Sequence, residues 1–214
     1  MTILAVPGHV SSRHISVLGD IHDPEVSIAV WERVPRITSS ELDRVFILLQ
    51  KEVRVHGCST AIIQHLRNTF RSFELEAPAL LKDVALLLDA FVWASKAKTL
   101  RLVLSVVNSN MCRRFHTDVN ELRLLCTYRG AGTLWLPKDA VNELAMRSRD
   151  PEIPIERSPA DILQVGTGHV AIIKGALYPG KHTGACVHRS PTIEEAGERR
   201  LLLRIDPDTP TFEL

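Results

Sequence analysis

The first hundred residues carry apolar side chains at the three-to-four-residue spacing of amphipathic helices. One helix is expected to follow Ser40, a second to run from about Thr60 to Phe70, and a third to begin at Pro78. The first stripe comprises Leu42, Val45, Phe46, Leu49 and Val53, and the third comprises Leu80, Leu81, Val84, Leu87, Leu88, Phe91 and Val92. Before these helices, Ser27 to Val34 is rich in strand formers.

From residue 100 onward the pattern changes to short strands with glycine turns between them. Strands are predicted over Leu100–Val107, Leu122–Tyr128, Thr133–Leu136, Asp161–Val165, His169–Ile173, Ala185–His188 and Arg200–Ile205. A short helix is predicted from Lys138 to Met146, and three prolines predict an exposed loop over residues 149–160. Such closely spaced strands favour a sandwich or barrel over a helix-alternating parallel sheet. We expect one domain over residues 1–214, with mainly helical support and one or two strands in 1–99 and a β core in 100–207.

The composition is that of an ordinary globular protein and narrows the function by exclusion. The 214 residues are 45% hydrophobic, and 26 basic residues nearly balance 25 acidic ones, which argues against binding of long nucleic acid. No apolar run reaches the roughly 18 residues of a membrane span, and residues 1–10 do not resemble a secretory signal. Four widely spaced cysteines are too few for a disulfide scaffold, so a reducing cytoplasm is the expected location.

His116, Asp118 and His188 form the candidate metal site. In an extended chain, side chains two positions apart share a face, so His116 and Asp118 can offer an imidazole and a carboxylate to one ion. If the strand that carries His188 folds back beside them, it brings a third ligand. Two histidines and one carboxylate leave three octahedral positions open, which is the arrangement of non-haem iron(II) oxygenases.

Arg199 and Arg200 open the last predicted strand and are candidates to bind a cosubstrate. A guanidinium there would hold one carboxylate of 2-oxoglutarate through two parallel hydrogen bonds, while the keto-acid end chelates the metal. Strand alternation groups Arg199 with the leucine face of the strand, so we favour Arg199 as the inward arginine and keep Arg200 as the alternative. Lys174 is a third cationic candidate. Tyr128 either hydrogen-bonds the cosubstrate or packs in the core.

The order of these residues resembles that of the iron(II)- and 2-oxoglutarate-dependent oxygenases. The resemblance covers about residues 100–206 and rests on His116-Thr117-Asp118, the distal His188 and the arginine after it. The stretch Tyr128–Thr133 is similar to a glycine-threonine stretch in those enzymes. Many of them place a serine two residues beyond the arginine, where this chain has Leu201 or Leu202. The resemblance implies an α+β protein with a double-stranded β-helix (jelly-roll, cupin-like) core, about three buttressing helices and hydroxylase-type activity.

Over about residues 20–207 the chain is also similar to a bacterial family known as a domain of unknown function. This similarity rests on Cys112–Asp118, Leu124–Tyr128 and His188–Pro191.

Two other functions remain open from the sequence. Cys186 lies two residues before His188, and a thiolate facing the ion would favour zinc, as in a jelly-roll metal-homeostasis protein without oxygenase activity. Alternatively, the helical half docks a partner and the three candidate ligands meet by coincidence. The primary substrate is not indicated.

Overall fold

A seven-stranded sheet forms the centre of the computed structural model, which describes residues 6–148, 150, 152–181 and 184–208. Its strand order is β1-β2-β8-β5-β10-β4-β3, and all neighbouring strands are antiparallel except β1 and β2. The strands are β1 (His9–Ser12), β2 (Ile28–Trp31), β3 (Val53–Gly57), β4 (Leu100–Val107), β5 (Leu122–Arg129), β8 (Val170–Lys174) and β10 (Arg200–Pro207).

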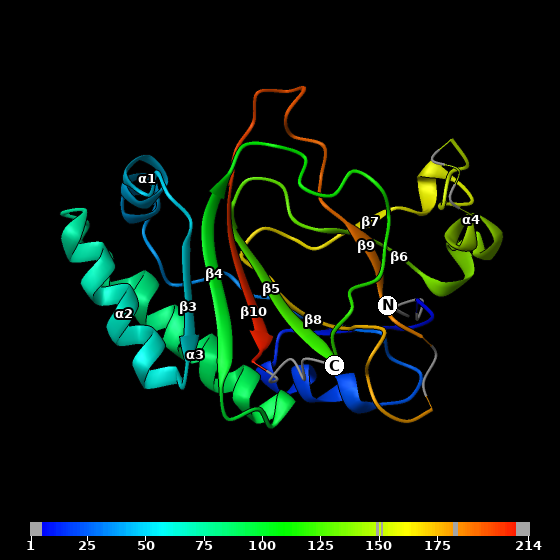
Figure 1. Cartoon of the computed structure of the whole chain (residues 1–214), viewed down its shortest axis with the longest axis horizontal. Helices are drawn as coiled ribbons and strands as arrows, with labels where there is room; N and C mark the ends of the chain where they lie inside the picture. Colours follow the sequence, from blue (N-terminus) through cyan, green and yellow to red (C-terminus); the bar gives the residue numbers. More distant parts are fainter. Residues whose placement is uncertain (1–5, 149, 151, 182–183, 209–214) are drawn as a thin grey trace, which may run out of the picture.

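A smaller sheet faces the large one and completes a jelly roll. Its order is β7-β6-β9, with bounds Leu163–Gln164, Leu134–Leu136 and Val187–Arg189, and a bridge between His116 and His188 adds a further extended segment beside β9. From β4 to β10 the chain passes repeatedly between the large and the small sheet (Figure 1). This is the path of a double-stranded β-helix, so the predicted fold is confirmed.

Three helices cover the outer face of the large sheet, as expected from their apolar stripes. They are α1 (Ser39–Leu48), α2 (Ser59–Ser72) and α3 (Pro78–Ser95), and Figure 1 shows α2 and α3 running behind β3 and β4. Side chains of the helices, such as Phe91, and of the strands, such as Leu104 and Leu203, are fully buried in one apolar cluster. A second cluster lies between the two sheets and includes Leu125, Trp135 and Leu202.

Strand β10, in the interior of the large sheet, is covered on both faces. Leu201, Leu203 and Ile205 belong to the helix-side cluster, whereas Leu202 belongs to the cluster between the sheets. Where a strand is covered on both sides, apolar residues are expected on both faces, which explains the continuous run from Leu201 to Leu203.

Several element boundaries differ from the sequence prediction. The first 99 residues supply three strands, because Val53 begins β3 instead of extending the first helix. That helix is capped by Thr38, whose Oγ1 accepts a hydrogen bond from the Glu41 amide. The helix predicted from Lys138 to Met146 is divided into η2 (Lys138–Ala140) and α4 (Glu143–Arg147), since Val141 pairs with Glu156 between them.

The remaining helical elements are the short 3-10 turns η1 (Ile15–His22) and η3 (Pro159–Asp161). Among the described residues, no helix combines the length and the apolar character needed to span a bilayer.

Candidate metal centre

The jelly-roll path brings the three candidate ligands to one place. His116 and Asp118 lie in the segment between β4 and β5, and His188 is the middle residue of β9. The backbones of His116 and His188 exchange two hydrogen bonds, with N···O distances of 3.0 and 2.9 Å. This antiparallel bridge fixes the separation of the two imidazoles, whose ring centroids are 4.7 Å apart.

The ligand atoms of all three side chains converge. His188 Nε2 lies 3.3 Å from Asp118 Oδ2, and His116 Nε2 lies 3.8 Å from Asp118 Oδ1. One ligand atom from each residue can be chosen so that all lie within 4.8 Å of one another. Two imidazoles and one carboxylate around a common point suit a divalent ion of the first transition row.

Hydrogen bonds on the far side of each imidazole prepare it as a metal ligand. His116 Nδ1 lies 3.1 Å from the carbonyl oxygen of Arg114, and His188 Nδ1 lies 3.1 Å from that of Cys186. A carbonyl oxygen only accepts, so each Nδ1 donates, and the lone pair of each neutral ring is left on Nε2. Both lone pairs then belong to the nitrogens nearest the carboxylate.

The electrostatic environment favours the protonation states that metal binding requires. Burial alone would raise the pKa of Asp118, but His188, Arg123 and His116 outweigh it and hold this pKa at about 2. Burial and the neighbouring His188 lower the pKa of His116 below its ordinary value. Near neutral pH, Asp118 is therefore ionised and His116 is neutral, as in metal complexes.

The carboxylate is buried, whereas the site as a whole is accessible. Asp118 Oδ2 is buried and forms an ion pair with Arg123 Nη1 at 2.5 Å. The site is also open on one side, since the His116 side chain is 35% exposed while those of Asp118 and His188 are 10% and 7% exposed. A ligand can therefore reach the site past His116.

Arg123 is a residue of the site that sequence reasoning missed. Its Nη1 lies 2.5 Å from Asp118 Oδ2, and its Nε donates to Asp206 Oδ1 at 2.6 Å. Arg123 thus pairs with the Asp118 oxygen that also lies beside His188 Nε2. The available signal was the position of Arg123 between Leu122 and Leu124 in β5, because a charge among buried apolar residues needs a partner.

The structure places Arg200 inside the jelly roll, which corrects our preference for Arg199. Arg200 is 2% exposed, and its Nη2 lies 3.2 Å from the Oγ of Ser190, two residues beyond His188. Arg199 is exposed, donates to the Phe46 carbonyl of α1 and stacks on the Phe46 ring. The leucine face of β10 packs on the helices and not on the jelly-roll interior, so the residue that shares this face points away from the site.

Tyr128 and Lys174 also lie away from the candidate metal centre. Tyr128 is on the helix side of β5, where its hydroxyl donates to Asp83 Oδ2 at 2.7 Å, so the alternative of a core aromatic is correct. Lys174 Nζ donates to the carbonyl of Asp23 at 2.7 Å and lies over the Tyr178 ring. Cys186 packs in the apolar cluster between the sheets and is not among the described residues whose ligand atoms converge, which are His116, Asp118 and His188.

The pattern of a protein family matches residues 12–206, which is nearly the whole chain, and its description reads "Protein of unknown function (DUF1826)". The chain belongs to the DUF1826 family. The expected similarity to a family of unknown function is thereby confirmed. No protein of curated function matches this DUF1826 chain.

Solved structures that resemble the DUF1826 chain have little sequence in common with it. The Arabidopsis thaliana dioxygenase for auxin oxidation 1, in a 2-oxoglutarate complex, is 9% identical, with 95% of this chain and 92% of that one covered and a TM-score of 0.47. A Pseudomonas putida prolyl-4-hydroxylase is 10% identical (82% and 97% covered, TM-score 0.38). A full-length Neurospora crassa protein in complex with alpha-KG is 11% identical (90% and 78% covered, TM-score 0.43). The fold assignment above rests on the strand order.

Proposed function

We propose that this protein is an iron(II)- and 2-oxoglutarate-dependent oxygenase of the hydroxylase type. The observation that carries the proposal is the convergence of two imidazoles and one carboxylate, with ligand atoms within 4.8 Å, in a jelly roll. Three protein ligands on one side of an octahedral ion leave three positions for exogenous ligands. That coordination is typical of iron(II) oxygenases.

His116, Asp118 and His188 would hold the iron, and Arg123 would keep the Asp118 carboxylate in place. Bound iron(II) would supply the redox chemistry by which 2-oxoglutarate, dioxygen and a substrate C–H group give succinate, carbon dioxide and a C–OH group. The carbonyls that accept from both Nδ1 atoms keep the imidazoles in one orientation and one tautomer. The protein thus contributes a set of ligands that is already in place, with two imidazoles and one carboxylate anion.

Arg200 is the residue that we propose for the distal carboxylate of 2-oxoglutarate. Burial lowers its pKa to about 10, which still leaves the guanidinium charged near neutral pH. Its Nε and Nη1 are buried and have no hydrogen-bond partner among the described residues. A buried cation with free donors is costly unless an anion pairs with it, and a carboxylate matches its planar fork.

An anaerobic titration with iron(II) and 2-oxoglutarate tests the function directly. We expect a visible charge-transfer absorption that saturates at one iron per chain and requires both components. A protein that retains zinc on purification, gives no such absorption and shows no uncoupled turnover of 2-oxoglutarate would instead be a zinc-binding or metal-homeostasis jelly roll. Cys186 lies in the apolar cluster and outside the converging ligand group, which removes the specific reason for favouring zinc.

Substitution of the two adjacent arginines separates their roles. Arg200→Met should weaken 2-oxoglutarate binding about 100-fold or more, because two hydrogen bonds between charged groups are lost at about 1.5–3 kcal/mol each. Arg199→Met changes the same residue type one position away, on the outer face of the strand. The dissociation constant of 2-oxoglutarate for this variant should stay within about twofold of that for the unmodified protein. The midpoint of the absorption titration gives both values, and equal effects would refute the assignment.

The proposal also includes the location of the protein in the cell. All four cysteines are free thiols, and two of them, Cys58 and Cys112, are exposed. Exposed thiols persist in the reducing cytoplasm, where 2-oxoglutarate is present as a small-molecule partner. We propose the cytoplasm as the location, with neither long nucleic acid nor a membrane as a partner.

A further inference from the structure

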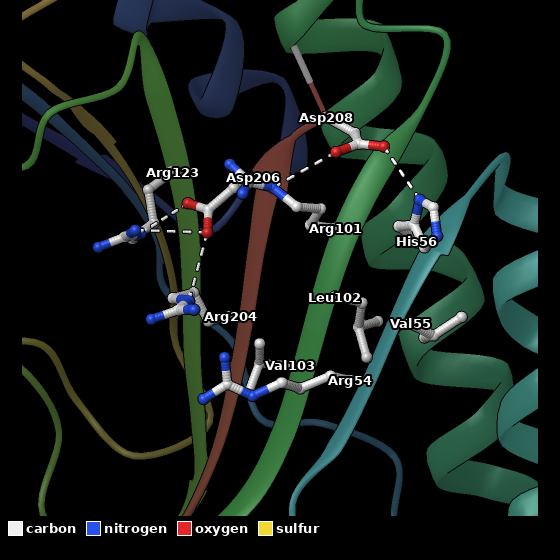
Figure 2. Close-up of a pocket in the computed structure, with 10 residues that line it drawn as sticks. All are labelled: Arg54, Val55, His56, Arg101, Leu102, Val103, Arg123, Arg204, Asp206 and Asp208. Atoms are coloured by element: carbon white, nitrogen blue, oxygen red, sulfur yellow. Dashed lines mark hydrogen bonds and ion pairs between the residues drawn. The ribbon is translucent and has the colours of Figure 1, made fainter. Parts of the chain in front are cut away.

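A pocket rich in arginine lies on the inner face of the large sheet (Figure 2), and one of its lining residues, Arg123, pairs with Asp118 of the candidate metal centre. Its volume is about 320 Å³. Four adjacent strands supply the charged residues that line it, which are Arg54 of β3, Arg101 of β4, Arg123 of β5, and Arg204 and Asp206 of β10, with Asp208 just beyond. The candidate ligands His116, Asp118 and His188 do not line the pocket, so it is a separate feature.

Strand register explains why these charges gather. Arg54 pairs with Val103 and Val103 with Arg204, so one row crosses β3, β4 and β10. In the next row His56 pairs with Arg101, and Arg101 with Asp206. The alternate residues of these strands, such as Leu102, pack in the helix-side cluster. The charged rows therefore face away from the helices.

Arginine outnumbers aspartate in the lining of the pocket. Four arginines and two aspartates line it, and Asp206 is already occupied, since it accepts hydrogen bonds from Arg123 and from the Asn120 amide. Two carboxylates outside the lining also pair with these arginines, Glu52 with Arg54 and Asp118 with Arg123. Arg204 Nε lies 3.3 Å from Asp206 Oδ2, but it is buried and makes no hydrogen bond of good geometry among the described residues. Burial and the nearby Arg123 and Arg54 lower the pKa of Arg204 despite Asp206.

The pocket is lined by Arg123, the residue that is ion-paired with the Asp118 carboxylate. Arg123 lines the pocket through its contact with Asp206 and reaches Asp118 Oδ2 at 2.5 Å with Nη1. A molecule held by the pocket arginines thus lies one side chain from a candidate metal ligand. Figure 2 shows Arg54, Arg204 and Arg123, from three strands, gathered on one side of the sheet.

We propose that this pocket binds the anionic group of the oxygenase's substrate, a small dianion such as a dicarboxylate or a phosphate monoester. The gathered guanidinium groups favour an anion, because their forks match carboxylate and phosphate oxygens. Arg204 also keeps a buried Nε that makes no hydrogen bond among the described residues. The volume is at the lower end of small-molecule sites and suits a metabolite. That the anion belongs to the substrate rests on the proposed function; the anion site itself does not.

Calorimetric titration with sulfate, a tetrahedral dianion, and with succinate tests the site. The protein is loaded with iron(II) chloride and saturated with 2-oxoglutarate under anaerobic conditions, so that the Arg200 site is filled. We expect at least one of the two probes to bind saturably at one per chain. Whichever probe binds more tightly identifies the class of anionic group. If neither probe binds saturably, the pocket proposal is overturned.

Matched double variants locate the binding. The double variant Arg54→Gln/Arg204→Gln should weaken binding of the dianion at least tenfold. Arg67→Gln/Arg71→Gln removes the same charge from exposed positions of α2 and should change the affinity less than twofold. The single variant Arg54→Gln, at a largely exposed side chain, should weaken binding several-fold without affecting folding. Equal losses in the two double variants would overturn the proposal, because bulk charge would then explain the binding.

The charge-transfer absorption separates this proposal from the proposed function. In the Arg54→Gln/Arg204→Gln variant, the 2-oxoglutarate concentration that gives half of the maximal absorption should stay within threefold of its value for the unmodified protein. A shift as large as that expected for Arg200→Met would make the pocket the cosubstrate site and overturn the proposal. If the unmodified protein gives no absorption yet binds a dianion saturably, the oxygenase proposal fails and the pocket remains an anion site.

Discussion

The double variant His116→Ala/Asp118→Ala is expected to lose stoichiometric iron(II). Replacement of residues that only support a metal ligand typically costs 10–100-fold in affinity. Loss of two of the three direct ligands should therefore weaken iron binding by more than about 100-fold, to below detection in metal analysis after gel filtration. The charge-transfer absorption with 2-oxoglutarate should disappear with the metal.

A second histidine–aspartate pair provides the matched control. His56 Nδ1 and Asp208 Oδ2 are 3.3 Å apart, and the His56 side chain is 78% exposed. His56→Ala/Asp208→Ala should retain one iron per chain. Far-ultraviolet circular dichroism shows whether each variant is folded. A folded His116→Ala/Asp118→Ala protein that still binds one equivalent of iron would refute the metal centre and with it the proposed oxygenase.

Asp83→Ala is expected to cause the largest loss of stability. Asp83 of α3 accepts hydrogen bonds from Arg33 at 2.5 and 2.8 Å and from Tyr128 of β5 at 2.7 Å. The Arg33 and Asp83 side chains are only 8% and 9% exposed. Removal of one partner leaves a buried charge unpaired, which costs about 3–5 kcal/mol. For a chain of this length that corresponds to a decrease in Tm of roughly 6–20 °C.

The exposed pair of Arg129 and Asp43 is the control for this stability measurement, since their side chains are 46% and 49% exposed. Asp43→Ala should change the free energy of unfolding by less than about 1 kcal/mol. Urea unfolding followed by circular dichroism measures both variants. If Asp83→Ala proves no more destabilising than Asp43→Ala, the buried network does not hold α3 to the sheet.

The candidate metal centre was accessible from the sequence because of the spacing of His116 and Asp118 and the strand predicted for His188. His116 and Asp118 share a face by their spacing of two, and the strand prediction for His188 identified a third extended segment. Strand β4 was predicted with its observed bounds, Leu100–Val107, since its β-branched and leucine residues are bounded by polar segments. Local sequence patterns therefore predicted the extended segments that carry the ligands, and the jelly-roll topology brings these segments together.

The orientation of β10 was not accessible from the sequence. An apolar face indicates burial, but it does not tell whether helices or the second sheet provide the cover. Leu201 and Leu203 face the helices, so Arg200 and not Arg199 faces inward. The arginine pocket was missed for a related reason, because it depends on the register of β3, β4 and β10, and β3 itself was mistaken for the end of a helix.

Alternation along β10 makes this strand intolerant of changes in length. Leu201, Leu203 and Ile205 anchor the helical layer, while Arg200, Arg204 and Asp206 supply charges on the opposite face. Inserting or deleting one residue within the strand would exchange the two sets, placing arginines against the helices and leucines in the polar interior. In natural relatives, insertions and deletions should therefore fall in the loops that flank this strand and not within it.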